Sequence, residues 1–266
     1  MLETFLICLA FGCFSGVLAG LFGLGGGVVL VPFFLVLLET QGVASNLLML
    51  MAVATSLATI IITSIAATIM QNHLGTVLWK YVFNLSFGII IGVIIGAFVA
   101  DSLTSENLRF IFALYLLYVA VQMAVQNKLE AQLKPLATFV LKLSGVAIGF
   151  VSSVLGIGGG TLTVPMLAKH QMPMRNAVAI SSACGLPIAV IGTITYAALG
   201  WQKTGLPDGS LGYVYLPAFA GIVLSSILTA PLGAKLANKL PTKSLKRYFS
   251  LLLFAVAGKL LWVIFI

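Results

Sequence analysis

Two glycine-rich segments carry the residues best suited to chemistry in this sequence. Residues 16–34 read GVLAGLFGLGGGVVLVPFF and residues 149–167 read GFVSSVLGIGGGTLTVPML, so seven of the nineteen aligned positions are identical. Three adjacent glycines cost roughly 1 kcal/mol per residue in a helix interior, relative to alanine. Each segment therefore predicts an unwound backbone followed by an outgoing helix, which starts near Val28 in the first and near Thr161 in the second.

The start of each outgoing helix is a predicted anion-binding site. The first N–H groups of a helix have no partner within it, and the positive end of the helix dipole adds to their attraction for negative charge. Pro32 and Pro165 each lie five residues beyond the last glycine, and the first turns of a helix are where proline costs least. The alternative explanation is close packing of two helices, because glycines let transmembrane backbones approach each other.

Short hydroxyl side chains near the glycines are further candidates, because each can donate a hydrogen bond to an oxyanion. One pair follows each glycine segment, and two threonines begin the second outgoing helix where the first has Val28 and Leu30. The simpler alternative is that each hydroxyl bonds the backbone of its own helix. The candidate substrate-binding residues are Gly25, Gly26, Gly27, Val28, Gly158, Gly159, Gly160, Thr161, Thr163, Thr55, Ser56, Ser181 and Ser182.

Groups typical of enzymes and metal sites are missing from the apolar segments. All six acidic residues lie at segment ends or in loops, so no carboxylate pair or nucleophile–histidine pair is evident. Cys8, Cys13 and Cys184 match no metal-ligand spacing. We therefore expect no catalytic residue, no metal and no cofactor. Lys259, inside the last apolar run, is expected to extend its amine to the surface or to act electrostatically on an anion.

The elements that hold these residues must lie in lipid. The chain has 266 residues, of which 61% are hydrophobic and 8% charged, with a mean hydropathy of +1.16. Soluble proteins carry about 25% charged residues. A soluble core could not bury this excess of apolar residues, so the sequence predicts an integral membrane protein. The first apolar run begins with Glu3 and lacks Lys and Arg, so it is expected to be part of the mature protein rather than a signal peptide.

An internal repeat organises these segments. A second match, between residues 96–109 and 233–246, follows the first in the same order and predicts a duplication whose halves join near 127–135. Segments 28–38 and 161–168 are too short to cross a bilayer. The predicted fold is an all-α polytopic membrane protein of two inverted repeats, each a glycine-tipped re-entrant hairpin plus three transmembrane helices. Repeat 1 spans 1–127 (hairpin 10–38; helices 47–70, 81–100 and 108–126) and repeat 2 spans 128–266 (hairpin 144–168; helices 176–199, 213–236 and 246–266), and together they form one transmembrane domain.

The basic residues favour this topology over one with four crossings in each half. With the hairpins folded back and Lys259 left out of the count, eleven basic residues lie on one membrane face and two on the other, whereas four crossings divide them eight to five. The positive-inside rule then places the larger set in the cytoplasm and both termini outside. The eleven are Lys80, Lys128, Lys134, Lys142, Lys169, Arg175, Lys235, Lys239, Lys243, Lys246 and Arg247; the two are Arg109 and Lys203. The net charge of +8 is thus a topology signal, and without interleaved aromatic residues it predicts no nucleic-acid partner.

At these residues the sequence resembles the sulfite exporter TauE/SafE family, membrane permeases of sulfur-containing anions. The resemblance covers nearly the whole chain and rests on GLFGLGGGVVLVP and SVLGIGGGTLTVP, on ATS at 54–56 and ISS at 180–182, and on a GA…L…L element in each half. It implies export of sulfite, sulfonates or related organosulfur anions across the cytoplasmic membrane.

The residues themselves suggest alternating access around a midplane site between the two hairpins. The alternatives are an anion channel or uniporter, a transporter of another small organic anion, a membrane enzyme and a scaffold subunit. Membrane lipid and a small sulfur-containing anion are the expected partners.

Overall fold

The chain folds almost entirely into helices, as the sequence predicts. The computed structural model describes residues 2–22, 26–125, 137–170, 172–237, 250–251 and 253–260. Its helices are α1 (Leu2–Phe22), α2 (Gly27–Thr40), α3 (Ser45–His73), α4 (Trp79–Ser102), α5 (Ser105–Val125), α6 (Thr138–Leu155), α7 (Gly160–Lys169), α8 (Met174–Gly200) and α9 (Leu216–Ala237). Residues 253–260 are helical as well. Between α8 and α9, the short strands β1 (Ser210–Leu211) and β2 (Val214–Tyr215) pair antiparallel.

Several helices are long and apolar enough to cross a membrane. Within the described residues they are α3, α4, α6, α8 and the segment Leu216–Gly233 of α9. The expected short arms are present as α2, with 14 residues, and α7, with 10. At 1.5 Å per residue these helices rise about 21 Å and 15 Å, which is less than the hydrocarbon core of a bilayer. The helix before the first glycine segment begins at Leu2 and is continuous for 21 residues, as the first apolar run predicts.

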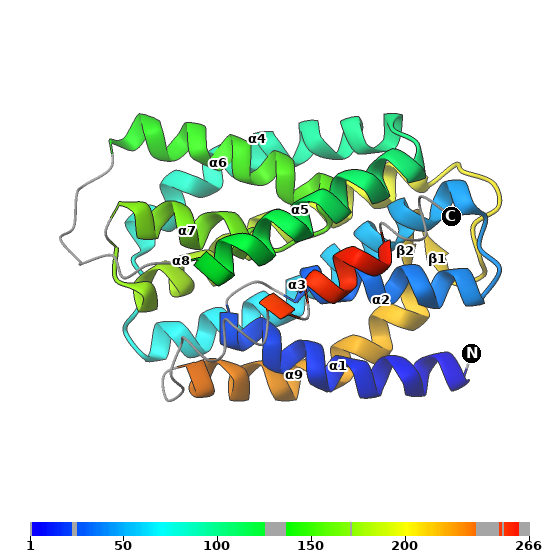
Figure 1. The fold of residues 1–266 in the computed structure, drawn as a ribbon, viewed down its shortest axis with the longest axis horizontal. Coiled ribbons are helices and arrows are strands. Elements are labelled where there is room, and N and C mark those ends of the chain that lie inside the picture. The colour runs from blue at the N-terminus through cyan, green and yellow to red at the C-terminus, as the bar shows by residue number, and fades with distance from the viewer. Residues whose placement is uncertain are drawn as a thin grey trace.

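The helices pack in matching pairs across the two halves of the chain. α1 lies against α9 and α6 against α4, while α3 and α8 meet in the middle of the bundle, with α2 on α3 and α7 on α8 (Figure 1). The α1–α2 hairpin opens at the right-hand end of the bundle in Figure 1, and the α6–α7 hairpin opens at the left-hand end. These opposed directions agree with two inverted halves, and the duplication itself stays a prediction.

Glycines set the close approach of the paired helices. A Cβ on Gly16 of α1 would lie 2.8 Å from the Cα of Ser226 on α9, and a Cβ on Gly149 of α6 would lie 2.4 Å from the carbonyl oxygen of Ile89 on α4. Small residues allow this approach, and van der Waals packing then holds the helices together in lipid. Packing thus explains Gly16 and Gly149, the first residues of the two glycine-rich segments.

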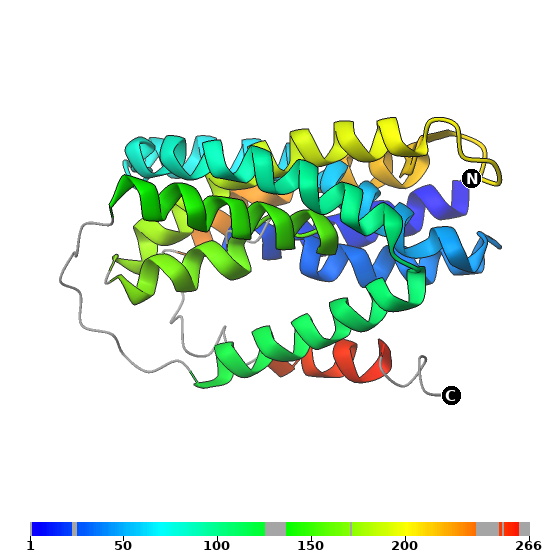
Figure 2. The same cartoon turned by 90° about the horizontal axis from the view of Figure 1, so that it is seen from above.

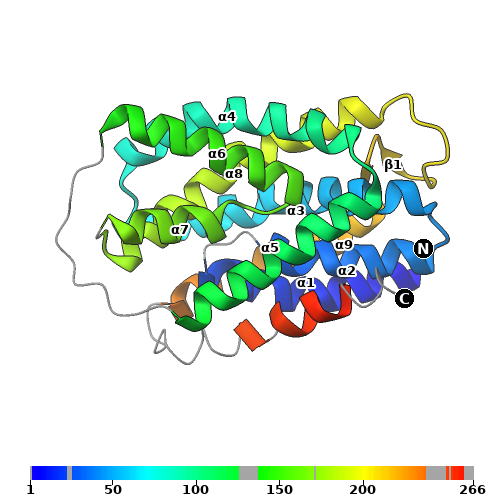
Figure 3. The ribbon, with the colours of Figure 1, turned by 45° about the horizontal axis from the view of Figure 1, so that its top comes forward.

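A separate layer flanks this bundle. α5 and the helical residues 253–260 lie on one side of the other helices (Figure 2), and α5 crosses the bundle obliquely (Figure 3). Leu116 of α5 and Leu253 are fully buried, so both helices of this layer contact the core. α5 therefore lies where it can cover the glycine segments.

Candidate functional site

Both outgoing helices begin at a glycine in the left-handed conformation. Gly26 precedes α2 with φ 80° and ψ −12°, and Gly159 precedes α7 with φ 74° and ψ −11°. A side chain is disfavoured at such positive φ values, so glycine is the natural residue at both places. The near identity of the two conformations shows that both glycine segments solve the same local problem.

The first N–H groups of α2 and α7 are left without partners inside their helices. The carbonyl of Gly26 accepts the N–H groups of Val29 and Leu30, both at 3.0 Å, and the carbonyl of Gly159 accepts those of Leu162 and Thr163, at 3.1 and 2.8 Å. The N–H groups that come before these bonds belong to Gly27 and Val28 in α2 and to Gly160 and Thr161 in α7, and they point out of the helix start. These are the donors that the sequence analysis assigned to an anion.

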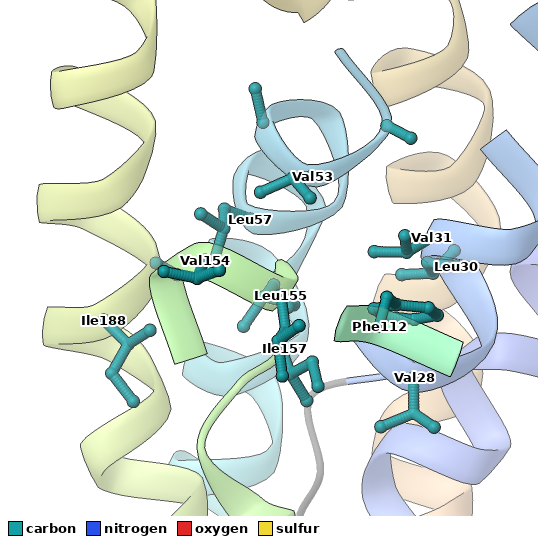
Figure 4. Packing of buried hydrophobic residues seen from close by; sticks show 14 of the residues in the cluster. Val28, Leu30, Val31, Val53, Leu57, Phe112, Val154, Leu155, Ile157 and Ile188 are labelled. Atoms are coloured by element: carbon teal, nitrogen blue, oxygen red, sulfur yellow. The ribbon is translucent and has the colours of Figure 1, made fainter. Parts of the chain in front are cut away.

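The two glycine segments meet in the core. A Cβ on Gly27 would stand 2.4 Å from the carbonyl oxygen of Gly156 and 3.0 Å from the Cα of Ile157. The hydroxyl of Ser56 donates to the same Gly156 oxygen at 2.8 Å. Figure 4 shows the aliphatic surroundings of this contact, with Val28 from the first half and Ile157 from the second. The expected meeting of the two glycine segments is therefore present, and apolar side chains surround the contact.

Only two of the three remaining predicted glycines lie within the described residues. Gly25 lies outside the described residues. Gly158 and Gly160 are buried, and the Gly158 carbonyl oxygen lies 3.3 Å from the point where a Cβ on Gly185 of α8 would stand. The second segment is thus enclosed by the neighbouring α8.

The paired hydroxyls of α3 and α8 are all buried and differ in what they contact. Thr55 accepts a hydrogen bond from the N–H of Tyr215 at 3.0 Å, whereas Ser56 donates across to the second glycine segment. Ser182 bonds the carbonyl of Val178 in its own helix at 3.1 Å. Ser181 is buried beside it. In this conformation Thr55 and Ser56 tie elements together, and Ser182 follows the simpler alternative of bonding its own helix.

The second helix start has hydroxyls that the first lacks. Thr161 contacts the hydroxyl of Tyr115 from α5, and Thr163 is fully buried. Ser152, near the end of α6, is also buried, with its Oγ 3.5 Å from the point where a Cβ on Gly159 would stand. Sequence reasoning did not select Ser152 or Tyr115. The repeat could have indicated Ser152, which aligns with Ala19, but no motif marks Tyr115.

Most of the charged residues are sorted by sign between the two ends of the bundle. Basic residues lie where α4 and α8 begin and where α7 and α9 end, which is the left-hand end in Figure 1. Acidic residues lie where α2 and α4 end and where α5 begins, at the opposite end. The basic set is Lys80, Lys169, Arg175 and Lys235, and the acidic set is Glu39, Asp101 and Glu106. Arg109, near the start of α5, and Lys203, beside Asp101, are basic residues at the acidic end. Lys259 is exposed on the helical residues 253–260.

One acidic residue is tied into the fold. Asp101 accepts a hydrogen bond from the Tyr213 hydroxyl at 2.7 Å and lies 3.9 Å from the amine of Lys203. Burial, and then this hydrogen bond, raise the pKa of Tyr213, so its phenol stays protonated and remains the donor. Within the described part of the chain, no three His, Cys, Asp or Glu side chains gather as a metal site. The described site is therefore made of backbone N–H groups and hydroxyls.

The whole chain matches one family of membrane proteins. The sequence profile of the family described as "Sulfite exporter TauE/SafE" matches residues 8–260. The chain belongs to the TauE/SafE family. Together with the long apolar helices, this membership identifies a multi-pass membrane transporter.

Relatives from distant organisms carry consistent names. A protein of Haemophilus influenzae named "Probable membrane transporter protein" is 38% identical over 258 residues, which is 97% of this chain and 98% of the relative. A similarly named protein of Methanocaldococcus jannaschii is 27% identical, over 93% of this chain and 90% of its own length. The protein named YunE of Bacillus subtilis is 25% identical, over 97% and 98%. No solved structure matches the chain.

Proposed function

We propose that this transporter carries sulfite, a sulfonate or a related small organosulfur anion out of the cell, by alternating access at a site between the two hairpins. The observation that supports the proposal is the contact between the start of α2 and the loop that leads into α7, with both helices led by a glycine in the left-handed conformation. Free N–H groups and the helix dipole favour an anion there. The sulfur chemistry comes from the family described as sulfite exporters.

The two hairpins open toward opposite ends of the bundle, which suits a carrier in which two halves move about a central site. In the proposed orientation the basic end faces the cytoplasm and the acidic end faces outward, because lysine and arginine are retained on the cytoplasmic side. The termini then lie outside the cytoplasmic membrane. Membership of a transporter family also supports the expectation that the chain is not an enzyme.

The orientation predicts which loops are reached from outside. Single cysteines introduced at residues 40–45, between α2 and α3, and at 101–106, between α4 and α5, should both react with a membrane-impermeant maleimide added to intact cells. Cysteines at 170–173, between α7 and α8, should react only after the membrane is opened. Cys13 is exposed in the structure, so it is first replaced by Ser. Labelling of the first two loops from opposite sides would contradict the inverted arrangement.

Transport itself is tested with the purified chain in proteoliposomes. We expect saturable uptake of labelled sulfite or methanesulfonate, accelerated when unlabelled anion is present on the opposite side. A conductance that neither saturates nor shows counterflow would indicate the alternative, an anion channel. Counterflow of small carboxylates, without counterflow of sulfite or sulfonates, would show that the chain is a transporter of a different substrate class.

A further inference from the structure

The structure points to one anion site rather than two. We infer that the anion binds at the start of α7, where Ser152 and Thr163 donate hydroxyl hydrogen bonds beside the free N–H groups, and that the site selects a singly charged oxyanion over a doubly charged one. This inference rests on the proposed function, because it names the site and charge class of the same transported anion.

The places beside Gly26 and Gly159 are equivalent in the two halves and carry different groups. A Cβ on Gly26 would lie 3.5 Å from the methyl group of Ala19, and a Cβ on Gly159 would lie 3.5 Å from the hydroxyl oxygen of Ser152. Ala19 and Ser152 are related by the same offset as the two glycine segments. The same spot beside the helix start is thus occupied by a methyl group in one half and by a donor in the other.

Two hydroxyls near the start of α7 are buried and make no hydrogen bond within the described part of the chain. Ser152 is 1% exposed and Thr163 is 0% exposed. Within the described part of the chain, neither side-chain oxygen has a hydrogen-bond partner. A buried hydroxyl left in this state costs about 1–3 kcal/mol, and native proteins satisfy nearly all of them. Both groups sit at the start of α7, Thr163 within its first turn and Ser152 against Gly159, so one ligand placed there would satisfy both.

A tyrosine of the flanking layer covers the start of α7. Tyr115 of α5 contacts the hydroxyl of Thr161, whereas the equivalent position in the first half is Val28. Tyr115 belongs to the flanking layer outside the paired helices (Figure 2). A movement of α5 that separates Tyr115 from Thr161 would open the start of α7 without unpacking α4 from α6.

The charge class follows from the donors available. The three side chains nearest to a Cβ on Gly159 are those of Ile188, Ile148 and Ser152, which bear aliphatic or hydroxyl groups and no charge. Thr163 in the first turn of α7 is uncharged as well. A helix start supplies the equivalent of roughly half a positive charge. That charge and several N–H and O–H donors nearly balance a monoanion. The second negative charge of a dianion would be buried largely uncompensated, which carries a large desolvation cost. Sulfonates and hydrogensulfite fit this site, and sulfate does not.

The test measures binding to the full chain in detergent by calorimetry, with methanesulfonate, sulfite and sulfate as probes. Methanesulfonate should bind with an affinity that does not change between pH 6 and 8. Sulfite should bind more tightly as the pH falls, because its singly protonated form increases. Sulfate should bind at least about a hundredfold more weakly than methanesulfonate, since a buried second charge is costly. Sulfate bound within a few fold of methanesulfonate would overturn the inference.

Variants locate the site. Ser152→Ala and Thr163→Val should each weaken methanesulfonate binding about tenfold or more, which is the loss of one hydrogen bond to a charged group. Ser152→Thr keeps a hydroxyl and should retain most of the affinity. The matched controls are Ser153→Ala and Thr59→Val, whose hydroxyls already bond the carbonyls of Phe150 and Ser56; they should bind like the original chain.

The outcomes separate the two proposals. If folded Ser152→Ala and Thr163→Val variants bind methanesulfonate as the original chain does, the site at α7 is wrong while the transport function stands. If the original chain binds and transports none of the sulfur anions, the proposed function itself fails. Thermal unfolding without ligand checks that each variant is folded.

Discussion

The two glycine hairpins have the same backbone conformation where their outgoing helices begin, and they differ in most of the side chains around it. Gly26 and Gly159 agree within 6° in φ and 1° in ψ, and each receives two N–H bonds from the turn that follows. Ala19 and Leu30 lie beside Gly26, whereas Ser152 lies beside Gly159, and Thr163 is the residue that aligns with Leu30. The two helix starts thus have the same backbone conformation and different side chains.

The hairpins also differ in how tightly their glycines are enclosed. A Cβ on Gly26 would meet ordinary contacts at 3.4 Å or more, but a Cβ on Gly159 would stand 2.5 Å from the Cδ1 of Ile188. Gly159, which precedes α7, is thus held against α8, whereas Gly26, which precedes α2, has space for one more carbon. The second hairpin has both the polar groups and the close packing, and the following predictions test that difference.

The largest effect is expected where the two hairpins touch. Gly27→Ala would place a Cβ 2.4 Å from the Gly156 carbonyl oxygen, and backbone must move to relieve the contact. We expect a loss of about 1–3 kcal/mol in the free energy of unfolding, as for other overpacked positions, together with loss of transport. Thermal unfolding in detergent and proteoliposome flux measure the two.

The control for this variant is Gly258→Ala, because a Cβ at Gly258 has no atom within 4 Å. Helix propensity should make that change neutral or stabilising by up to about 1 kcal/mol. Equal stability of the two variants would mean that the hairpin tips are not in contact in the folded protein.

An intermediate effect separates the two left-handed glycines. Gly26→Ala should cost roughly 1–2 kcal/mol, the strain of an alanine at positive φ. Gly159→Ala should cost about 1 kcal/mol more, because its Cβ also meets Ile188. Chemical denaturation of both variants gives the comparison.

Ile188→Val removes the Cδ1 atom that the new Cβ would meet. In the double variant with Gly159→Ala it should recover that extra loss, so the two changes are not additive. Combined with Gly26→Ala, which lies in the other hairpin, the same change should be additive. Additive behaviour in both pairs would show that Ile188 does not press on Gly159.

The smallest effect compares two aligned serines. Ser56→Ala removes the bond that joins α3 to Gly156 in the other half and should cost about 1 kcal/mol. Ser182→Ala removes a bond within its own helix and should change stability by less than about 0.5 kcal/mol, because alanine is the better helix former. A larger loss at Ser182 would reverse the assignment of Ser56 as the link between the halves. Thermal unfolding of the two variants side by side provides the measurement.

Much of the fold was predictable because the hydropathy pattern of a membrane protein directly indicates its helices. Long apolar runs give the spans, and the glycine runs mark where α2 and α7 start, since consecutive glycines oppose helix and a positive φ requires one of them. The repeat also indicated that the two segments would meet.

The site was predictable only in its backbone part. Thr161 and Thr163 stand inside the motif, so the residue types alone select them. Ser152 lies one turn before the glycines, and only the distance to Gly159 shows that its hydroxyl is turned toward the helix start. Tyr115 comes from a helix that is distant in sequence and belongs to the flanking layer, so its contact with Thr161 depends on tertiary packing that no local pattern encodes.

The side chains nearest to Gly159 (Ile188, Ile148 and Ser152) carry no charge, and this has an electrical consequence. A monoanion carried by a neutral site moves one full negative charge across the membrane with each transport cycle. A membrane potential of 100 mV, negative inside, is worth about 2.3 kcal/mol for each elementary charge. At equilibrium it would hold the anion roughly fiftyfold more concentrated outside than inside. In the proposed orientation the potential alone would drive export, and a separate coupling ion would not be needed.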